Sequence, residues 1–238
     1  MISFFLPTRR CTNLWSRPTN LPMEKGSDMR KMDNNIFEMI NKYAEELSLM
    51  DGYRRDVNKI MLNLAGNCYE TADNADFAAL SQDDIEIVSP EDTSHFIEYK
   101  LLQGNHDINA LVLSATPYCR QAAKQGRPLI AALDDMAQIV GYRVETVSYD
   151  EQAVKNALKK AEGCFVRDKG VTITCGRNLY EAVVALTILE KSAEVNLKAE
   201  ALGGAKPLPK IEADFMRMIY KKKYSKAEQE VKSKEGDA

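Results

Sequence analysis

The sequence is poor in the residues that most often bind catalytic metals. It has only two histidines, His95 and His106, so a zinc site built from three histidines is excluded by their number. The five cysteines are widely spaced and form no Cys-x-x-Cys pair, which argues against a zinc ribbon or a disulfide framework. A site with mixed Cys, Asp and Glu ligands stays open. We interpret the cysteines as reduced, mostly buried thiols of a cytoplasmic protein.

A Gly-Asn pair is a second feature that could do chemistry. The segment LNLAGNCYE (62–70) is predicted to be a strand interrupted by a turn at Gly66 and Asn67. Backbone N–H groups in such a turn can bind a phosphate group. The same turn can also be required for folding alone, and the sequence leaves both interpretations open.

Length and composition predict one globular domain. The 238 residues are 45% hydrophobic and 28% charged, which suits a single α/β domain with a full core. The net charge of −3, with acidic and basic residues interspersed, argues against nucleic acid as a partner. No apolar run approaches the roughly 18 residues that a membrane span needs, so we expect no membrane partner.

Both ends of the chain differ from its centre in composition. Residues 1–31 contain three prolines and several arginines but no acidic residue before Glu24. We interpret them as a disordered extension, with a targeting segment as the alternative. Residues 32–226 are the predicted domain, and residues 227–238 are a predicted charged tail.

The spacing of apolar residues predicts short strands alternating with helices. Helices are expected at residues 33–63, 92–104, 116–126, 150–163 and 178–204, with a final basic helix from residue 211. Strands are expected at residues 77–80, 83–89, 108–114 and 142–149, with a hairpin at 164–176 that turns at Asp168-Lys169-Gly170. This alternation indicates an α/β fold.

Several of these segments resemble the class II aldolase/adducin family in order and spacing. They are INALVLSATPY, LDDMAQIVG, LAGNCYE, LSQDDIEIV and CFVRDKGVTITCG, which together span roughly residues 35–224. The resemblance implies a central, mostly antiparallel sheet flanked by helices on both sides. It also implies a homo-oligomer, typically a tetramer, and zinc-dependent cleavage or epimerisation of phosphorylated sugars.

The positions that carry the family's metal ligands hold other residue types here. The family's His-x-His pair falls on Leu113 and Ala115, and its third histidine falls on Lys169. An aliphatic side chain offers no donor atom to a metal. We therefore predict no metal ligands and no cofactor.

Of the three residues at these positions, Lys169 is the one whose side chain could bind a ligand or take part in catalysis. Its ammonium group could attract an anionic ligand in place of zinc. A desolvated lysine of lowered pKa could instead form a Schiff base with a carbonyl compound. A solvated lysine in a hairpin turn is the third interpretation.

The family's catalytic Glu and one of its phosphate loops are also absent. The Glu falls on Ser94, whose hydroxyl cannot act as a carboxylate base without help. His95 could serve as the base, or it could lie on a helix surface. A phosphate-binding loop is missing between residues 77 and 80. The resemblance leaves these positions for ligand binding: Gly66, Asn67, Ser94, Ser114 and Thr116.

Two functional hypotheses follow from these residues. The first is a diverged, non-catalytic binding or scaffold protein that keeps a cleft for a small anionic metabolite; adducin shows that the family tolerates a structural role. The alternative is a metal-independent aldolase, lyase or epimerase acting on a phosphosugar-like carbonyl compound through Lys169 and His95. A metal-dependent aldolase with Asp, Glu or Cys ligands ranks below both, because Leu113 and Ala115 cannot coordinate.

Overall fold

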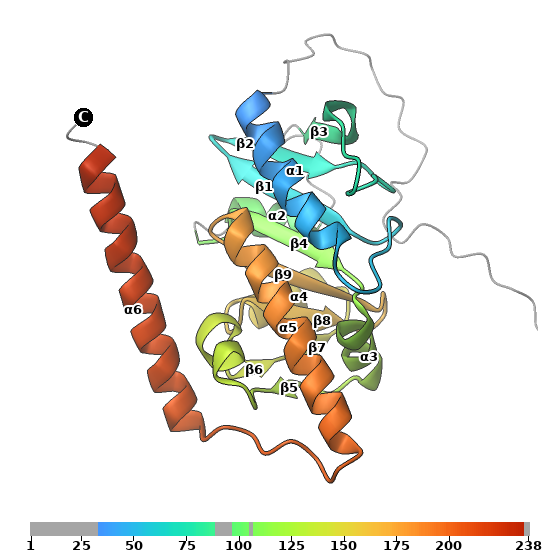
Figure 1. Ribbon diagram of the computed structural model, residues 1–238, viewed down its shortest axis with the longest axis vertical. Coiled ribbons are helices and arrows are strands. Elements are labelled where there is room, and N and C mark those ends of the chain that lie inside the picture. The colour runs from blue at the N-terminus through green and yellow to red at the C-terminus, as the bar shows by residue number, and fades with distance from the viewer. Residues whose placement is uncertain (1–32, 89–96, 105–106, 236–238) are drawn as a thin grey trace, which may run out of the picture.

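The computed structural model describes residues 33–88, 97–104 and 107–235, with side chains as far as Lys223. A seven-stranded sheet in the order β3-β2-β1-β4-β9-β8-β7 forms its centre (Figure 1). Within the described ranges, β7 and β8 are the one parallel pair of this sheet. Its strands are β1 (Lys59–Leu64), β2 (Asn67–Thr71), β3 (Ile85–Val88), β4 (Ala110–Ser114), β7 (Thr146–Val147), β8 (Gly163–Val166) and β9 (Val171–Gly176). A small second sheet pairs β5 (Leu129–Ile130) with β6 (Arg143–Val144).

Helices cover both faces of the large sheet. α1 and α5 lie on one face, where α5 packs on β4 and β9, while α2 and α4 cover the other (Figure 1). The helices are α1 (Asn34–Ser48), α2 (Ile97–Gly104), α3 (Pro117–Gln125), α4 (Glu151–Leu158), α5 (Leu179–Glu200) and α6 (Lys210–Glu235), with the 3-10 turn η1 (Gln82–Asp84) and the π-helical turn η2 (Met136–Val140). The predicted α/β fold, with a mostly antiparallel sheet between helices, is confirmed.

Alternation along β4 sets which side chains face which helices. Leu111 and Leu113 point into an apolar cluster beneath α2 and α4. Ala110 and Val112 point into a second cluster beneath α1 and α5. Since both faces are buried, β4 reads in the sequence as one continuous apolar run.

Local signals in the sequence explain several element ends. Asp150 caps α4 by accepting a hydrogen bond from the backbone N–H of Ala153 at 2.9 Å. Pro117 begins α3, and Gly126 ends it with φ of 70°. Four cysteines are buried and free of disulfides, as predicted: Cys68, Cys119, Cys164 and Cys175.

Two predicted elements were wrong. The helix expected at 33–63 ends at Ser48, because Gly52 adopts φ of 71° and the chain then enters β1. The strand expected at 77–80 is a turn, in which the buried Phe77 packs on Tyr53 rather than pairing in a sheet.

The extension predicted at residues 1–31 lies outside the described residues. α6 continues to Glu235, into the segment predicted to be a charged tail. The domain boundaries themselves stay predictions. None of the helices in the described ranges combines the length and apolar character that a bilayer span requires.

Candidate functional site

The positions expected from the resemblance to carry metal ligands are buried in apolar surroundings. Leu113 is 0% exposed and Ala115 is 6% exposed. Both belong to the cluster beneath α2 and α4, together with Val171 and Ile173 of β9. The carboxyl end of β4 is therefore filled by hydrocarbon side chains.

Lys169 lies close to this end of β4, in the turn between β8 and β9. Its Nζ atom is 4.1 Å from the ring centroid of Tyr149, a cation–π geometry. The neighbouring Asp168 accepts a hydrogen bond from the backbone N–H of Tyr149 at 2.8 Å. These two contacts hold the turn against the segment between β7 and α4.

Glu98 of α2 completes a group of three polar side chains with Tyr149 and Lys169. It is only 4% exposed, and the Tyr149 hydroxyl donates to both of its carboxylate oxygens at 2.9 Å. Burial raises the pKa of Glu98, opposed by the hydrogen bond from Tyr149 and the charge of Lys169. Burial lowers the pKa of Lys169, opposed by Glu98 and Asp168. Each charge thus partly offsets the burial of the other.

A second group of charges lies beside the first. Lys59 pairs in register with Leu113, so it points to the same face of the sheet. Its Nζ atom is 3.0 Å from Asp73 and 3.6 Å from Glu70, whose carboxylate also accepts a hydrogen bond from the Tyr99 hydroxyl. Lys59 also lowers the pKa of Glu98 through its charge. This end of the sheet therefore holds a network of lysines, carboxylates and tyrosine hydroxyls.

Chemically, the network offers a lysine and a buried carboxyl group but a poor set of metal donors. No group of three His, Cys, Asp or Glu side chains in the described part of the chain could hold a metal ion. A lysine of lowered pKa beside a carboxyl of raised pKa could exchange a proton or attack a carbonyl carbon. The same charges also satisfy one another, as in a structural network.

Gly66 and Asn67 lie far from this network. β1 and β4 are antiparallel, with Leu62 opposite Ala110 and Lys59 opposite Leu113, so the β1–β2 turn is at the opposite end of the sheet. Gly66 has φ of 81° and Ala65 has φ of 51°, typical of a two-residue hairpin turn. The structure does not bring Gly66 and Asn67 together with Ser114, Thr116 or Lys169.

Ser114 and Thr116 are buried in the fold, and Thr116 is hydrogen-bonded within it. Both are 2% exposed, and Ser114 points away from Leu113 by strand alternation. The Thr116 hydroxyl donates to Glu190 of α5 at 2.5 Å. Glu190 also accepts the first-turn N–H groups of Tyr118 and Cys119, at 2.9 Å and 2.8 Å, so it satisfies the amino end of α3.

Three residues singled out in the sequence lie outside the described residues: Ser94, His95 and His106. The roles predicted for Ser94 and His95 therefore stay predictions.

Comparisons with known proteins agree on one family. Residues 46–197 match the family described as Class II Aldolase and Adducin N-terminal domain. The chain belongs to this family. No curated protein matches the sequence.

Solved structures of class II aldolases share the fold at low identity. An L-fuculose 1-phosphate aldolase has a TM-score of 0.71 at 17% identity, covering 80% of this chain and 98% of its own. The enzyme of that name from Thermus thermophilus has a TM-score of 0.63 at 16% identity, over 74% of this chain and 100% of its own. YgbL from Escherichia coli, titled a putative aldolase/epimerase/decarboxylase, has a TM-score of 0.65 at 17% identity, over 77% and 98%.

The residues at the class II aldolase metal positions do not fit the family's zinc ion. Leu113 and Ala115 contribute no donor atom, and Lys169 presents a cation. Leu113 and Ala115 lie in an apolar cluster. The charge of Lys169 is already offset by Glu98 and Asp168. No step of chemistry can be routed through a metal at these three positions.

Sequence reasoning missed the residue most closely tied to Lys169. Glu98 lies four residues after Ser94, the spacing of one turn in the helix predicted at 92–104, so a search of the sequence for a carboxylate at that spacing could have found it. The sequence alone does not connect Tyr149 with Lys169, because the two side chains meet only in the folded structure. The position of Lys59 beside Leu113 could not be predicted from the sequence, because it depends on the register between β1 and β4.

A pocket adjoins Ala115, one of the three altered metal positions. It has a volume of about 440 Å³ and is lined by Ala115 and by the cationic side chains of Arg54, Arg120 and Lys124. Arg54 is held by Asp56, with two hydrogen bonds at 3.0 Å and 2.6 Å. Arg120 and Lys124 come from α3, one turn apart.

Proposed function

We propose that this protein is a class II aldolase family member that no longer performs the metal-dependent reaction and acts as a binding or scaffold protein. One observation carries the proposal: Leu113, at the first metal-ligand position, is 0% exposed inside an apolar cluster. A zinc site would require at least two imidazoles in the place of these hydrocarbon contacts. Loss of the metal therefore comes with a repacked core at the same place.

The charges that remain near the former metal site support a binding role. Arg120 and Lys124 line the pocket beside Ala115, where a small anionic metabolite could bind. Lys169 is directed toward Tyr149 and Glu98 and helps to hold the fold. By resemblance to its family, the protein acts as a homo-oligomer, expected to be a tetramer, in the cytoplasm.

A cleavage assay tests the proposal directly. Purified protein is incubated with L-fuculose 1-phosphate, the compound named for the structural relatives, with added Zn²⁺ and separately with a chelator. We expect no aldehyde above the uncatalysed background in either condition. Cleavage that needs Zn²⁺ and stops with the chelator would contradict the proposal.

A second candidate function is a metal-independent lyase that uses Lys169. The lowered pKa of Lys169, next to a carboxyl group of raised pKa, favours it. The neutral amine of Lys169 would add to a substrate carbonyl and water would leave, giving an iminium that accepts the electron pair of the breaking C–C bond. The hydroxyl proton of the substrate would pass to a base, for which His95 is the predicted residue.

Borohydride trapping separates the two candidates. The protein is incubated with dihydroxyacetone phosphate and sodium borohydride, and its peptides are analysed by mass spectrometry. A reduced adduct on Lys169 supports the lyase. Labelling of Lys169 that does not exceed that of the exposed Lys191, the background control, supports the non-catalytic function.

A further inference from the structure

A second cavity lies at the end of the sheet opposite to the metal positions. It has a volume of about 730 Å³ and includes Asp107 and Ile108 before β4, Cys175 and Gly176 at the end of β9, and Glu162 before β8. β4 and β9 are antiparallel, with Ala110 opposite Gly176 and Ser114 opposite Thr172, so this cavity and Lys169 lie at opposite ends. Its volume suits a ligand of nucleotide size.

Positive charge exceeds negative charge in the lining of this cavity. Three carboxylates line it: Asp107, Glu162 and Glu181. Six cationic side chains line it: Lys100, Lys155, Lys159, Arg177, Arg217 and Lys221. Lys100 is paired with Glu151 outside the lining, at 2.7 Å. An excess of positive charge remains after these pairs are counted, which favours an anionic ligand.

The inner cations of the cavity are fixed in place. Arg217 of α6 donates to the backbone carbonyls of Gln138 and Ile139, at 3.3 Å and 3.1 Å, and also to Glu162. Glu162 in turn is 3.2 Å from the ammonium of Lys221. Arg177 is held by Glu181 through its backbone N–H at 2.9 Å and through its side chain. Groups held in this way need little rearrangement to meet a ligand.

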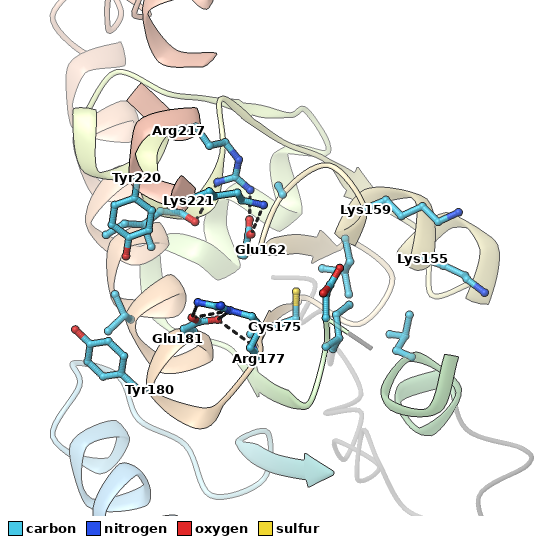
Figure 2. Close-up of a pocket in the computed structure, with 18 of the residues that line it drawn as sticks. Lys155, Lys159, Glu162, Cys175, Arg177, Tyr180, Glu181, Arg217, Tyr220 and Lys221 are labelled. Atoms are coloured by element: carbon cyan, nitrogen blue, oxygen red, sulfur yellow. Dashed lines mark hydrogen bonds and ion pairs between the residues drawn. The ribbon is translucent and has the colours of Figure 1, made fainter. Parts of the chain in front are cut away.

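The outer cations of the cavity come from α4 and from the residue that caps its C-terminus. Lys155 and Lys159 are one helical turn apart, and Figure 2 shows both on the same side of the cavity. Among the residues that the structure describes, neither ammonium group has an ion-pair partner. Their charges are therefore available to a ligand.

Two tyrosines lie on the side of the cavity away from α4 (Figure 2). Tyr180 of α5 is 48% exposed, and Tyr220 of α6 is half-buried. Exposed tyrosine rings beside fixed charges often receive the planar part of a ligand. The cavity thus places the two tyrosines and the two outer lysines, Lys155 and Lys159, on opposite sides (Figure 2).

We propose that this cavity binds a small organic anion that carries two or more negative charges and a planar ring, of which a nucleoside diphosphate is representative. The charged groups bind at Lys155 and Lys159, and the ring lies against Tyr180 and Tyr220 on the other side of the cavity (Figure 2). Nothing in this proposal depends on catalysis at Lys169.

Calorimetric titration of the full chain tests the proposal with three probes. ADP without added metal supplies ring and charge, pyrophosphate supplies charge alone, and adenosine supplies the ring alone. We expect ADP to bind once per chain, pyrophosphate to bind more weakly, and adenosine to give no measurable heat. Failure of both ADP and pyrophosphate to bind at millimolar concentration would overturn the proposal.

Matched variants locate the binding. Lys155→Gln with Lys159→Gln should weaken ADP binding on the order of tenfold. The control pair, Lys191→Gln with Lys206→Gln, removes the same charge from exposed lysines that line none of the pockets described above. The control pair should change the affinity for ADP less than twofold. Tyr180→Leu should weaken ADP but not pyrophosphate. Equal weakening by both lysine pairs would contradict the proposal, since it would reflect net charge rather than this cavity.

Discussion

The two ends of the central sheet differ in how their space and charge are used. At the end with Leu113 and Lys169, hydrocarbon side chains occupy two of the family's metal positions, and the charge of Glu98 opposes the effect of burial on the pKa of Lys169. At the other end, a cavity of about 730 Å³ holds more cations than carboxylates. The class II aldolase fold is therefore kept here without the family's metal ligands, and a cavity with an excess of cations lies at the other end of the sheet.

The largest effect is expected from a cavity at the filled end. Leu113→Ala should lower the free energy of unfolding by about 3 kcal/mol, because Leu113 is fully buried and its neighbours cannot collapse onto the space. Ile139→Ala, at the half-buried wall of the opposite cavity, should cost only about 1 kcal/mol. Urea denaturation measures both. Equal losses of unfolding free energy in the two variants would contradict a tightly packed sheet end at Leu113 and an open one at Ile139.

A smaller effect is expected at the cationic end. Arg217→Met removes two carbonyl contacts and one ion pair from a side chain that is only 16% exposed, and should cost about 2 kcal/mol. Lys221→Met is the matched control; its side chain is 59% exposed, so its loss should cost less than about 0.5 kcal/mol. Both are measured by urea denaturation. If the two variants were equally stable, Arg217 would not be a fixed part of the cavity.

The pH dependence of stability tests the compensated charges near Lys169. Burial raises the folded-state pKa of Glu98 above its ordinary value of 4.5, so the folded protein binds the proton more tightly than the unfolded chain. The stability contributed by this proton is complete below pH 4.5 and is lost as the pH rises through the folded pKa. Glu98→Gln does not titrate. The stability of the unsubstituted protein relative to this variant should therefore fall from pH 4.5 upward, and a constant difference would contradict the burial of Glu98.

The smallest effect concerns the outer lysines of the cavity. Lys155→Gln with Lys159→Gln should change the free energy of unfolding by less than about 0.5 kcal/mol, because neither has an ion-pair partner among the described residues. Thermal melts measure this. A large loss of stability would mean that these lysines hold the fold rather than receive a ligand.

Much of the fold could be predicted because its signals are local. Asp150 as a helix cap, Pro117 at the start of a helix and the turn at Asp168-Lys169-Gly170 all act within a few residues of themselves. The strand predicted at residues 77–80 was wrong because a short apolar run can be buried without being a strand. Here Phe77 packs on Tyr53.

The two sites were predictable to different degrees. Leu113, Ala115 and Lys169 could be found by comparing residue types with a family pattern, which needs no structure. The cavity joins Lys155, Arg177 and Arg217, which are distant in the sequence and meet only through the packing of α4, α5 and α6. No spacing rule in the sequence connects them. The partnership of Lys169 with Glu98 likewise depends on how α2 packs on the sheet.

The zinc content of the protein tests the central claim most directly. The full chain is purified without an affinity-tag metal, saturated with Zn²⁺, dialysed and examined by elemental analysis, with its mass in solution recorded alongside. We predict less than about 0.1 equivalent of zinc per chain, since Leu113 and Ala115 offer no donor atoms. A value near one equivalent, lost on Lys169→Met but kept on Lys191→Met, would place a metal at the former family site and contradict the account.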